Sequence, residues 1–256
     1  MIDSRIVYLK FAKKVKQQNR SEKLIMRFYA LLLVIIFSSF RFFPKKGKAL
    51  SLSFFLLTMV AVLRKYTVGA DTGQWWRVYT VIVTDPSWDF RKYRFEPGFY
   101  YLCKILGLIY QNPQIVISLT SIFINYSVYS FIKKNSLDYC LSTILYVITN
   151  NYFSNLNVMR QAIAVAILLY GYEYLKRKKY PIYIIFIAVA ASFHIVAVAA
   201  LLWLLFIILP DKRKTVILEV LIGLITFVFY NQFFDLLTRF WGYGGYRSWP
   251  SRFFFY

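Results

Sequence analysis

The stretch PIYIIFIAVAASFHIVAVAALLWLLFIIL, residues 181–209, contains no lysine, arginine, aspartate or glutamate. As one α-helix it would measure about 43 Å, at a rise of 1.5 Å per residue. The hydrocarbon core of a bilayer is about 30 Å thick, so this stretch is long for one crossing and short for two. It therefore predicts a membrane segment that breaks near its midpoint, at SFH, residues 192–194.

Similar apolar runs recur along the chain, which is 59% hydrophobic and 21% aromatic. That share is well above the usual apolar content of a soluble domain. The sequence predicts an all-α polytopic integral membrane protein with about seven to eight hydrophobic helical segments, some re-entrant or broken. The candidate spans are residues 26–43, 49–63, 98–111, 114–132, 137–153, 157–175, 181–209 and 215–231.

The net charge of +21 is distributed in short basic groups between the apolar runs. In a soluble protein such a charge indicates nucleic-acid binding, but no nucleic-acid-binding motif is present, so nucleic acid is not a predicted partner. The groups follow the positive-inside bias. Placing them in the cytoplasm puts the polar loop 64–97 outside and requires 98–111 to enter and return. They are Lys45, Lys46 and Lys48, Lys133 and Lys134, Lys176 to Lys179, and Lys212 to Lys214.

The amino terminus does not fit this orientation, because residues 1–27 carry eight lysines and arginines. Three interpretations remain: a signal-peptide n-region, a cationic amphipathic surface helix, or translation that begins at Met26. The predicted organisation is therefore a cationic extension at 1–25, a transmembrane helical domain at 26–231, and an aromatic tail at 232–256. Cys103 and Cys140 lie inside apolar runs and are expected to fill the core rather than form a disulfide or metal site.

Four polar motifs interrupt the apolar background. They are RKYTVGADTGQWW at 64–76, FEPGFYYL at 95–102, NVMRQAIA at 157–164 and SFHIVAVA at 192–199. The first lies in the loop 64–97, which also carries Trp88, Asp85 and Asp89. An acidic, aromatic loop at a membrane surface is either an interfacial belt or a sugar-binding surface, and composition alone favours the belt.

The order and content of these motifs resemble the EpsG family of Wzy-like bacterial exopolysaccharide polymerases. That family typically has R-Y-x-V-G-x-D-x-x-x-Y after its second span, followed by E-P-x-F, I-R-Q-x-x-A and F-H-x-S-A. Here Trp75 replaces the last tyrosine of the first motif, and Val196 stands where a serine is common. The resemblance covers about residues 26–230. Because members usually continue with further spans, it also predicts a chain truncated at its carboxyl end.

The resemblance implies a glycosyltransferase-type enzyme that polymerises lipid-linked oligosaccharide repeat units at the outer face of the bacterial plasma membrane. A sugar hydroxyl of one repeat attacks the anomeric carbon of another, and a polyprenyl diphosphate leaves. The implied partners are the polyprenyl-diphosphate-linked oligosaccharide, the lipid bilayer and other polysaccharide-assembly proteins. The reaction needs a cation for the diphosphate and a base for the hydroxyl, and it implies no cofactor and no metal.

Arg160 is the expected cation. On one helix it would share a face with Asn157, Gln161 and Ala164, at spacings of three and four residues. In the first turn, unpaired backbone N–H groups also favour an anion, and a guanidinium matches phosphate oxygens bidentately. The alternative is an arginine that snorkels to the interface and only anchors the helix. With the resemblance, we expect Arg160 to be catalytic and Gln161 to bind substrate.

The other candidates each have a functional and a structural interpretation. Asp71 is the preferred catalytic base, or a turn residue after glycine. Arg64 is a second phosphate clamp or a flanking anchor. Glu96 binds sugar hydroxyls or caps the following helix, while His194 is catalytic or a core histidine. Trp75 is assigned to substrate binding with the aromatic loop.

We further expect Arg160 to approach Asp71 or Glu96 across a polar pocket that opens outward, because an arginine at this depth needs an anionic partner. Three other functions stay open: a transporter or flippase of lipid-linked sugars, a membrane acyltransferase, and an inactive truncated remnant. The sequence shows no internal symmetry of the kind common in transporters. Its sole histidine has no partner motif for acyl transfer.

Overall fold

The computed structural model describes residues 27–28, 30–69, 71–87, 89 and 96–208, with short pieces between 216 and 229. Every regular element in these ranges is a helix, which confirms the all-α class. The predicted extension 1–25, the tail 232–256 and most of the last candidate span, 215–231, lie outside the described residues.

Within the described ranges, α5 (Gln114–Asn135) is the one helix long and apolar enough to cross a membrane by itself, with mean hydropathy 1.7. Large apolar side chains also point outward from shorter helices; Leu108 is 88% exposed and Ile185 is 61% exposed. An apolar surface of this kind suits contact with lipid. Seven to eight complete crossings remain a prediction. The shorter apolar helices include Ala30–Phe42, α4 (Pro97–Ile109), α6 (Tyr139–Ile148) and α9 (Tyr180–Phe193).

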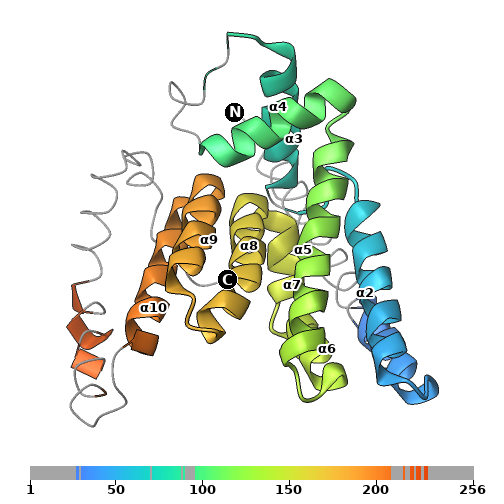
Figure 1. Cartoon of the computed structure of the whole chain (residues 1–256). Coiled ribbons are helices and arrows are strands. Elements are labelled where there is room, and N and C mark those ends of the chain that lie inside the picture. Colours follow the sequence, from blue (N-terminus) through green and yellow to red (C-terminus); the bar gives the residue numbers. More distant parts are fainter. Residues whose placement is uncertain are drawn as a thin grey trace, which may run out of the picture. The chain divides into compact units, whose positions relative to one another are not determined.

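The chain forms two compact units, and the first is built around α2 (Lys46–Val62) and α5. These helices run antiparallel (Figure 1) and are joined at both ends. Ser51 Oγ lies 3.0 Å from the Tyr129 hydroxyl at one end, and Arg64 donates to Ser121 Oγ at 2.7 Å at the other. The helix Ala30–Phe42, α6 and α7 (Asn151–Asn157) complete this unit.

The core of the first unit is apolar and aromatic. Leu50 and Leu57 of α2 are fully buried beside Ile36 and Tyr152. The Tyr152 hydroxyl donates to the Leu57 carbonyl at 2.7 Å, so the polar end of this buried ring is satisfied. Burial of α7 against α2 therefore needs no water.

One expected span of this unit is wrong. Residues 137–153 were predicted as a single segment, but α6 ends at Ile148 and α7 starts at Asn151. Between them Asn150 has a left-handed backbone, with φ 64°. Asparagine tolerates this conformation better than most residues because its short side chain can bond locally. The pair Asn150–Asn151 was the sequence signal for this break.

The second unit contains α3 (Thr72–Thr84) from Gln74 onward, α4, α8 (Met159–Lys176) from Arg160 onward, α9, the 3₁₀ helix η1 (Ile195–Ala199) and α10 (Ala200–Ile208). Figure 1 shows α9 and α10 lying side by side. Leu175, Tyr183, Ile187 and Leu204 form an apolar cluster between these helices. At Gly171, an added Cβ would lie 2.9 Å from the Phe186 Cβ, so α8 and α9 are in close contact.

The long apolar stretch 181–209 breaks where the sequence predicts. α9 ends at Phe193, His194 is extended (φ −156°, ψ 115°), and η1 and α10 follow. Residues 182–209 contain no glycine or proline to impose the break. Contacts from other parts of the second unit must therefore stabilise it.

The loop 64–97 is not irregular throughout, because residues 72–84 form α3. Trp75, Tyr79 and Ile82 are buried at spacings of four and three residues. This is the stripe of an amphipathic helix. The composition of the loop favours a membrane interface, but the spacing of these residues indicates a helix with one buried face.

Candidate functional site

A buried polar cluster lies within the second unit, at the ends of its helices. Trp75 comes from the first turns of α3, Glu96 directly precedes α4, Arg160 lies in the first turn of α8, and His194 directly follows α9. We call these four residues the Arg160 cluster. Helix ends converge here, so several short polar segments can meet without a charged residue inside an apolar helix.

Arg160 and Glu96 form an ion pair, with Arg160 Nη1 donating to Glu96 Oε2. The side chains are 15% and 6% exposed, so the pair is largely withdrawn from water. The second carboxylate oxygen, Oε1, lies 3.4 Å from Nδ1 of His194. One carboxylate thus faces a permanent cation with one oxygen and an imidazole with the other. Of the two predicted partners, Asp71 and Glu96, Arg160 contacts Glu96; the outward-opening pocket stays a prediction.

Trp75 packs on the guanidinium. The Arg160 Cζ lies 4.6 Å from the centre of the Trp75 ring, within the range of a cation–π interaction. The ring also meets Phe99 edge-on, with 5.5 Å between ring centroids, and is 4% exposed. Trp75 is therefore buried against protein, which argues against a place in an interfacial belt, while its assignment to substrate binding stays a prediction.

The FEPGF motif places Glu96 in this cluster. Glu96 occupies the position before the first turn of α4, but its side chain makes no capping hydrogen bond. Pro97 suits the first helical position, where its missing N–H has no helical partner. A Cβ on Gly98 would lie 2.5 Å from Ser192 Oγ and 2.7 Å from the Ser192 carbonyl oxygen. Glycine therefore permits α4 to approach the end of α9 and brings Glu96 beside His194.

Two of these contributors were not identified from the sequence. Gly98 and Ser192 are small residues without a charged or aromatic group. The available signal was that each stands two residues from a candidate residue in a short motif, Gly98 from Glu96 and Ser192 from His194. Small residues in such places permit close approach of backbones.

The expected common face of Asn157, Arg160, Gln161 and Ala164 is not present. Asn157 is the last residue of α7, and α8 begins at Met159 after a break at Val158. Arg160 does lie in the first turn of α8, as predicted. Gln161 is exposed, whereas Ala164 is buried. The side chain of Gln161 thus lies on the exposed side of α8, and its assignment to substrate binding remains a prediction.

Arg64 forms a second polar centre, within the first unit. Its Nη1 donates to the Ala61 carbonyl at 2.7 Å and to Ser121 Oγ at 2.7 Å, and its Nη2 lies 3.5 Å from the Leu156 carbonyl. Those carbonyls belong to the last turns of α2 and α7, where a cation is favoured by the helix dipole. Burial lowers the pKa of Arg64 to about 10, which still leaves it charged at neutral pH. This geometry favours a structural role for Arg64.

The rest of the first motif surrounds this centre. Gly69 has φ 101°, which favours glycine, and an added Cβ would lie 2.6 Å from Thr72 Oγ1 and 2.7 Å from Asn157 Oδ1. Thr72 Oγ1 donates to the Leu156 carbonyl at 3.2 Å. Asp71 belongs to the first unit, directly before α3, and is half-buried. Its predicted role as a base is not tested by these contacts.

Sulfur and metal-ligating residues do not add a further site in the described ranges. Cys103 is a buried free thiol, as expected for a core residue, and Cys140 is a half-buried free thiol. No group of three or more histidine, cysteine, aspartate or glutamate side chains in those ranges is arranged to hold a metal ion. The Arg160 cluster itself offers a guanidinium, a carboxylate and an imidazole.

The chain belongs to the EpsG family, whose family model matches residues 47–251. The match includes all four motifs and confirms the resemblance drawn from them. Membership indicates a membrane protein with a role in exopolysaccharide biosynthesis, and the family is associated with polysaccharide polymerase activity. Comparison with curated proteins and with solved structures gives no significant match.

Proposed function

We propose that this protein polymerises lipid-linked oligosaccharide repeat units at the outer face of the bacterial plasma membrane. The observation that carries the proposal is the Arg160 cluster, in which a cation, a carboxylate and an imidazole are buried together in one unit. Ionisable residues inside a membrane protein are costly and usually mark a functional site. Polymerase activity in the family supports the same reaction.

Arg160 is the proposed site for the diphosphate. A guanidinium carries N–H donors in a fixed plane, and this fork matches phosphate oxygens bidentately. The first turn of α8 adds backbone N–H groups and the positive end of the helix dipole. Diphosphate oxygens would therefore meet a bidentate donor that Trp75 and Glu96 hold in place. As negative charge develops on the leaving group, such a donor stabilises the transition state.

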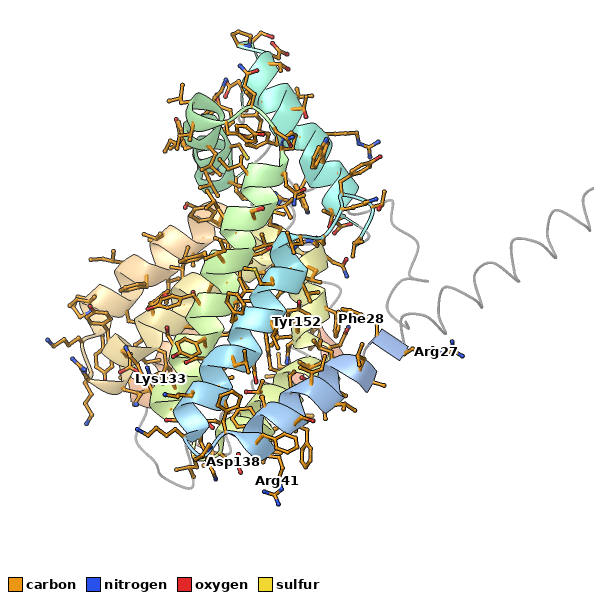
Figure 2. The ribbon with its side chains drawn as sticks, turned by 90° about the vertical axis from the view of Figure 1, so that its right-hand side faces the viewer. Arg27, Phe28, Arg41, Lys133, Asp138 and Tyr152 are labelled. Atoms are coloured by element: carbon orange, nitrogen blue, oxygen red, sulfur yellow. The ribbon has the colours of Figure 1, made fainter. Side chains whose placement is uncertain are left out.

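A multi-pass arrangement with the basic segments in the cytoplasm accompanies this proposal. Within the first unit, Lys45 and Lys46 precede or begin α2, and Lys133 and Lys134 lie in the last turn of α5. Because the two helices are antiparallel, both groups gather at one end of the unit. Figure 2 shows Lys133 with Arg41 and Asp138 at that end. This grouping is the one the positive-inside bias produces.

The activity is tested in two settings. In the native host, deletion of the gene should abolish the polymer and leave single lipid-linked repeats, and the full chain should restore it. In vesicles, the purified chain should convert lipid-linked repeats, extracted from the deletion strain, into longer lipid-linked products. Single repeats that stay unchanged beside a folded wild-type chain would exclude polymerisation as its function.

The orientation has its own test, in a variant lacking Cys103 and Cys140. Gln74 and Arg177 are exposed in the structure, so each accepts a cysteine without loss of packing. An impermeant maleimide added to intact cells should label the cysteine at 74 and should label that at 177 only after lysis. The reverse pattern would contradict the proposed orientation, because Gln74 would then face the cytoplasm and Arg177 the outside.

A transporter of the same lipid-linked sugar is the second candidate, because the α9–η1–α10 segment is a broken helix at the cluster. Discontinuous helices of this kind form substrate sites in transporters. The two functions differ in product. A transporter would move single repeats across the vesicle membrane without lengthening them, whereas a polymerase would lengthen repeats that are already on the accessible face.

A further inference from the structure

We infer that Glu96 and His194 form a carboxylate–imidazole dyad in which His194 is the general base and Glu96 is its positioning residue. The inference rests on the proposed function, since it names the group that takes the proton in polymerisation. It replaces the sequence-based expectation that Asp71 is the base.

The first argument is the division of the Glu96 carboxylate between two partners. Oε2 accepts from Arg160, which fixes the plane of the carboxylate. Oε1 then faces His194 Nδ1 across 3.4 Å. Nδ1 is buried and makes no hydrogen bond in this structure, and such catalytic contacts commonly shorten when substrate binds. A carboxylate at Nδ1 favours the neutral tautomer with its proton on Nδ1 and a lone pair on Nε2.

The second argument is access. Nδ1 of His194 is completely buried, yet the side chain as a whole is 19% exposed. The exposed surface of the side chain therefore belongs to its other atoms, and Nε2 is the ring nitrogen that does not face Glu96. The nitrogen that needs orienting faces the carboxylate. A core histidine with only a packing role needs neither arrangement.

The third argument is the cost of the local structure. His194 has an extended backbone that interrupts a long apolar helix, in a segment without glycine or proline. Gly98 permits the contact with Ser192 that brings the start of α4 to this break. Both features serve to place one carboxylate beside one imidazole. The guanidinium in the same cluster carries only hydrogen-bond donors, so the imidazole is the group that can accept a proton.

The proposed step is balanced in protons and electrons. His194 Nε2 accepts the proton of a sugar hydroxyl while the hydroxyl oxygen bonds to the anomeric carbon of a second repeat. The bond between that carbon and the diphosphate oxygen breaks, and its electron pair stays on the leaving polyprenyl diphosphate beside Arg160. Glu96 stabilises the imidazolium until the proton passes to water. The neighbours of His194 that carry charge in this step are Glu96 and Arg160.

The test uses the full chain in vesicles, with lipid-linked repeats extracted from the deletion strain. His194→Ala should slow polymerisation by about 100-fold or more. Added imidazole should raise the rate of this variant by about tenfold or more. Binding of undecaprenyl diphosphate, the probe for the Arg160 side of the cluster, should remain within about twofold of wild type. Glu96→Gln should slow turnover without a response to imidazole, because the native imidazole is still present. Gly47→Ala, an open position in α2, is the control.

The outcomes separate the dyad from the proposed function. If wild type polymerises and His194→Ala does so equally well, the dyad is wrong and polymerisation stands. A slow His194→Ala variant that folds but gains nothing from imidazole also overturns it, since the residue would then be structural. Should His194→Ala not fold, His194→Gln replaces it, and turnover near wild type would again exclude a base at this position. If the wild-type chain makes no polymer, the proposed function itself fails.

Discussion

Arg64 and Arg160 are both buried arginines beside helix ends, but their surroundings differ in kind. Arg64, in the first unit, meets neutral oxygens: two backbone carbonyls and the Ser121 hydroxyl. Arg160, in the second unit, meets the Glu96 carboxylate and the Trp75 ring. The first arrangement uses a cation to satisfy the open carbonyls of two helices. The second pairs the cation with a carboxylate, a partner that another anion can replace.

The comparison shows how to separate a structural arginine from a functional one. A guanidinium held by fixed carbonyls has little reason to move, because releasing them leaves buried acceptors unsatisfied. A guanidinium paired with a carboxylate can transfer part of its bonding to a phosphate while the carboxylate bonds elsewhere, here to His194. The partner of the guanidinium is therefore the informative feature.

The largest effect is expected from neutralising the Arg160 cluster. In the double variant Arg160→Gln/Glu96→Gln, polymerisation should fall by about 1,000-fold, since a charged donor to the leaving group is lost. The free energy of unfolding should change by no more than about 1 kcal/mol, because a neutral hydrogen-bonded pair replaces a buried ion pair. Polymer assays and thermal unfolding in detergent measure the two quantities. Full activity in this variant would remove the distinction between the two arginines.

Arg64→Ala should show the opposite pattern. It removes the guanidinium that donates to the Ala61 carbonyl and to Ser121 Oγ, at a cost of about 2 kcal/mol or more. Thr72 Oγ1 still donates to the Leu156 carbonyl. The midpoint of thermal unfolding and the yield of folded protein should both fall. Protein that does fold should retain its turnover per folded molecule. A stable Arg64→Ala chain with no polymer would instead assign Arg64 to the substrate, as a second phosphate clamp.

A smaller effect is expected at the close contact between Gly98 and Ser192, which brings Glu96 beside His194. Gly98→Ala introduces a Cβ within 2.5 Å of Ser192 Oγ, and overpacking of this kind costs about 2 kcal/mol. Turnover should fall as well, because α4 must shift away from His194. Gly47→Ala is the matched control, since nothing lies within 4 Å of its new Cβ. Equal stability of the two variants would contradict the close approach.

The smallest effect is expected at Gln161, which follows Arg160 but is exposed. Gln161→Ala should change the free energy of unfolding by less than about 0.5 kcal/mol, as for most surface substitutions. Polymerisation should stay within about twofold of wild type by the same assay. A large loss of polymer at unchanged stability would show that the exposed side of α8 also binds substrate.

The sequence predicted contacts between oppositely charged side chains, but not contacts that depend on how the helices pack. The need of a buried arginine for an acid identified Glu96, and the excess length of 181–209 located the break at His194. Asp71 and Glu96 had equal standing as partners, since no rule of spacing separates them. The inward position of Arg64 was also missed, because its partners are backbone carbonyls, which every sequence contains.

Helix boundaries were the other limit. The predicted span 137–153 joined α6 to the start of α7, and the predicted span 157–175 joined Asn157, the last residue of α7, to α8. α3 was missed because its buried stripe is made of tryptophan, tyrosine and isoleucine, residues that also suit a membrane interface. In each case the same residue composition fits two structures, and only tertiary packing determines which one forms.

The buried polar side chains of α5 have a consequence for how the protein is made. Each bonds to a carbonyl of α5 itself, so none depends on a neighbouring helix for that bond. They are Thr120 and Ser121 to Ile117, Asn125 to Ser121, and Ser127 to Phe123. α5 can therefore enter lipid as a single helix and pack in a later step against α2, which precedes it in the chain. Glycosylation mapping of an isolated 114–135 segment should find it inserted, whereas failure to insert would mean that α2 and α5 enter the bilayer as a pair.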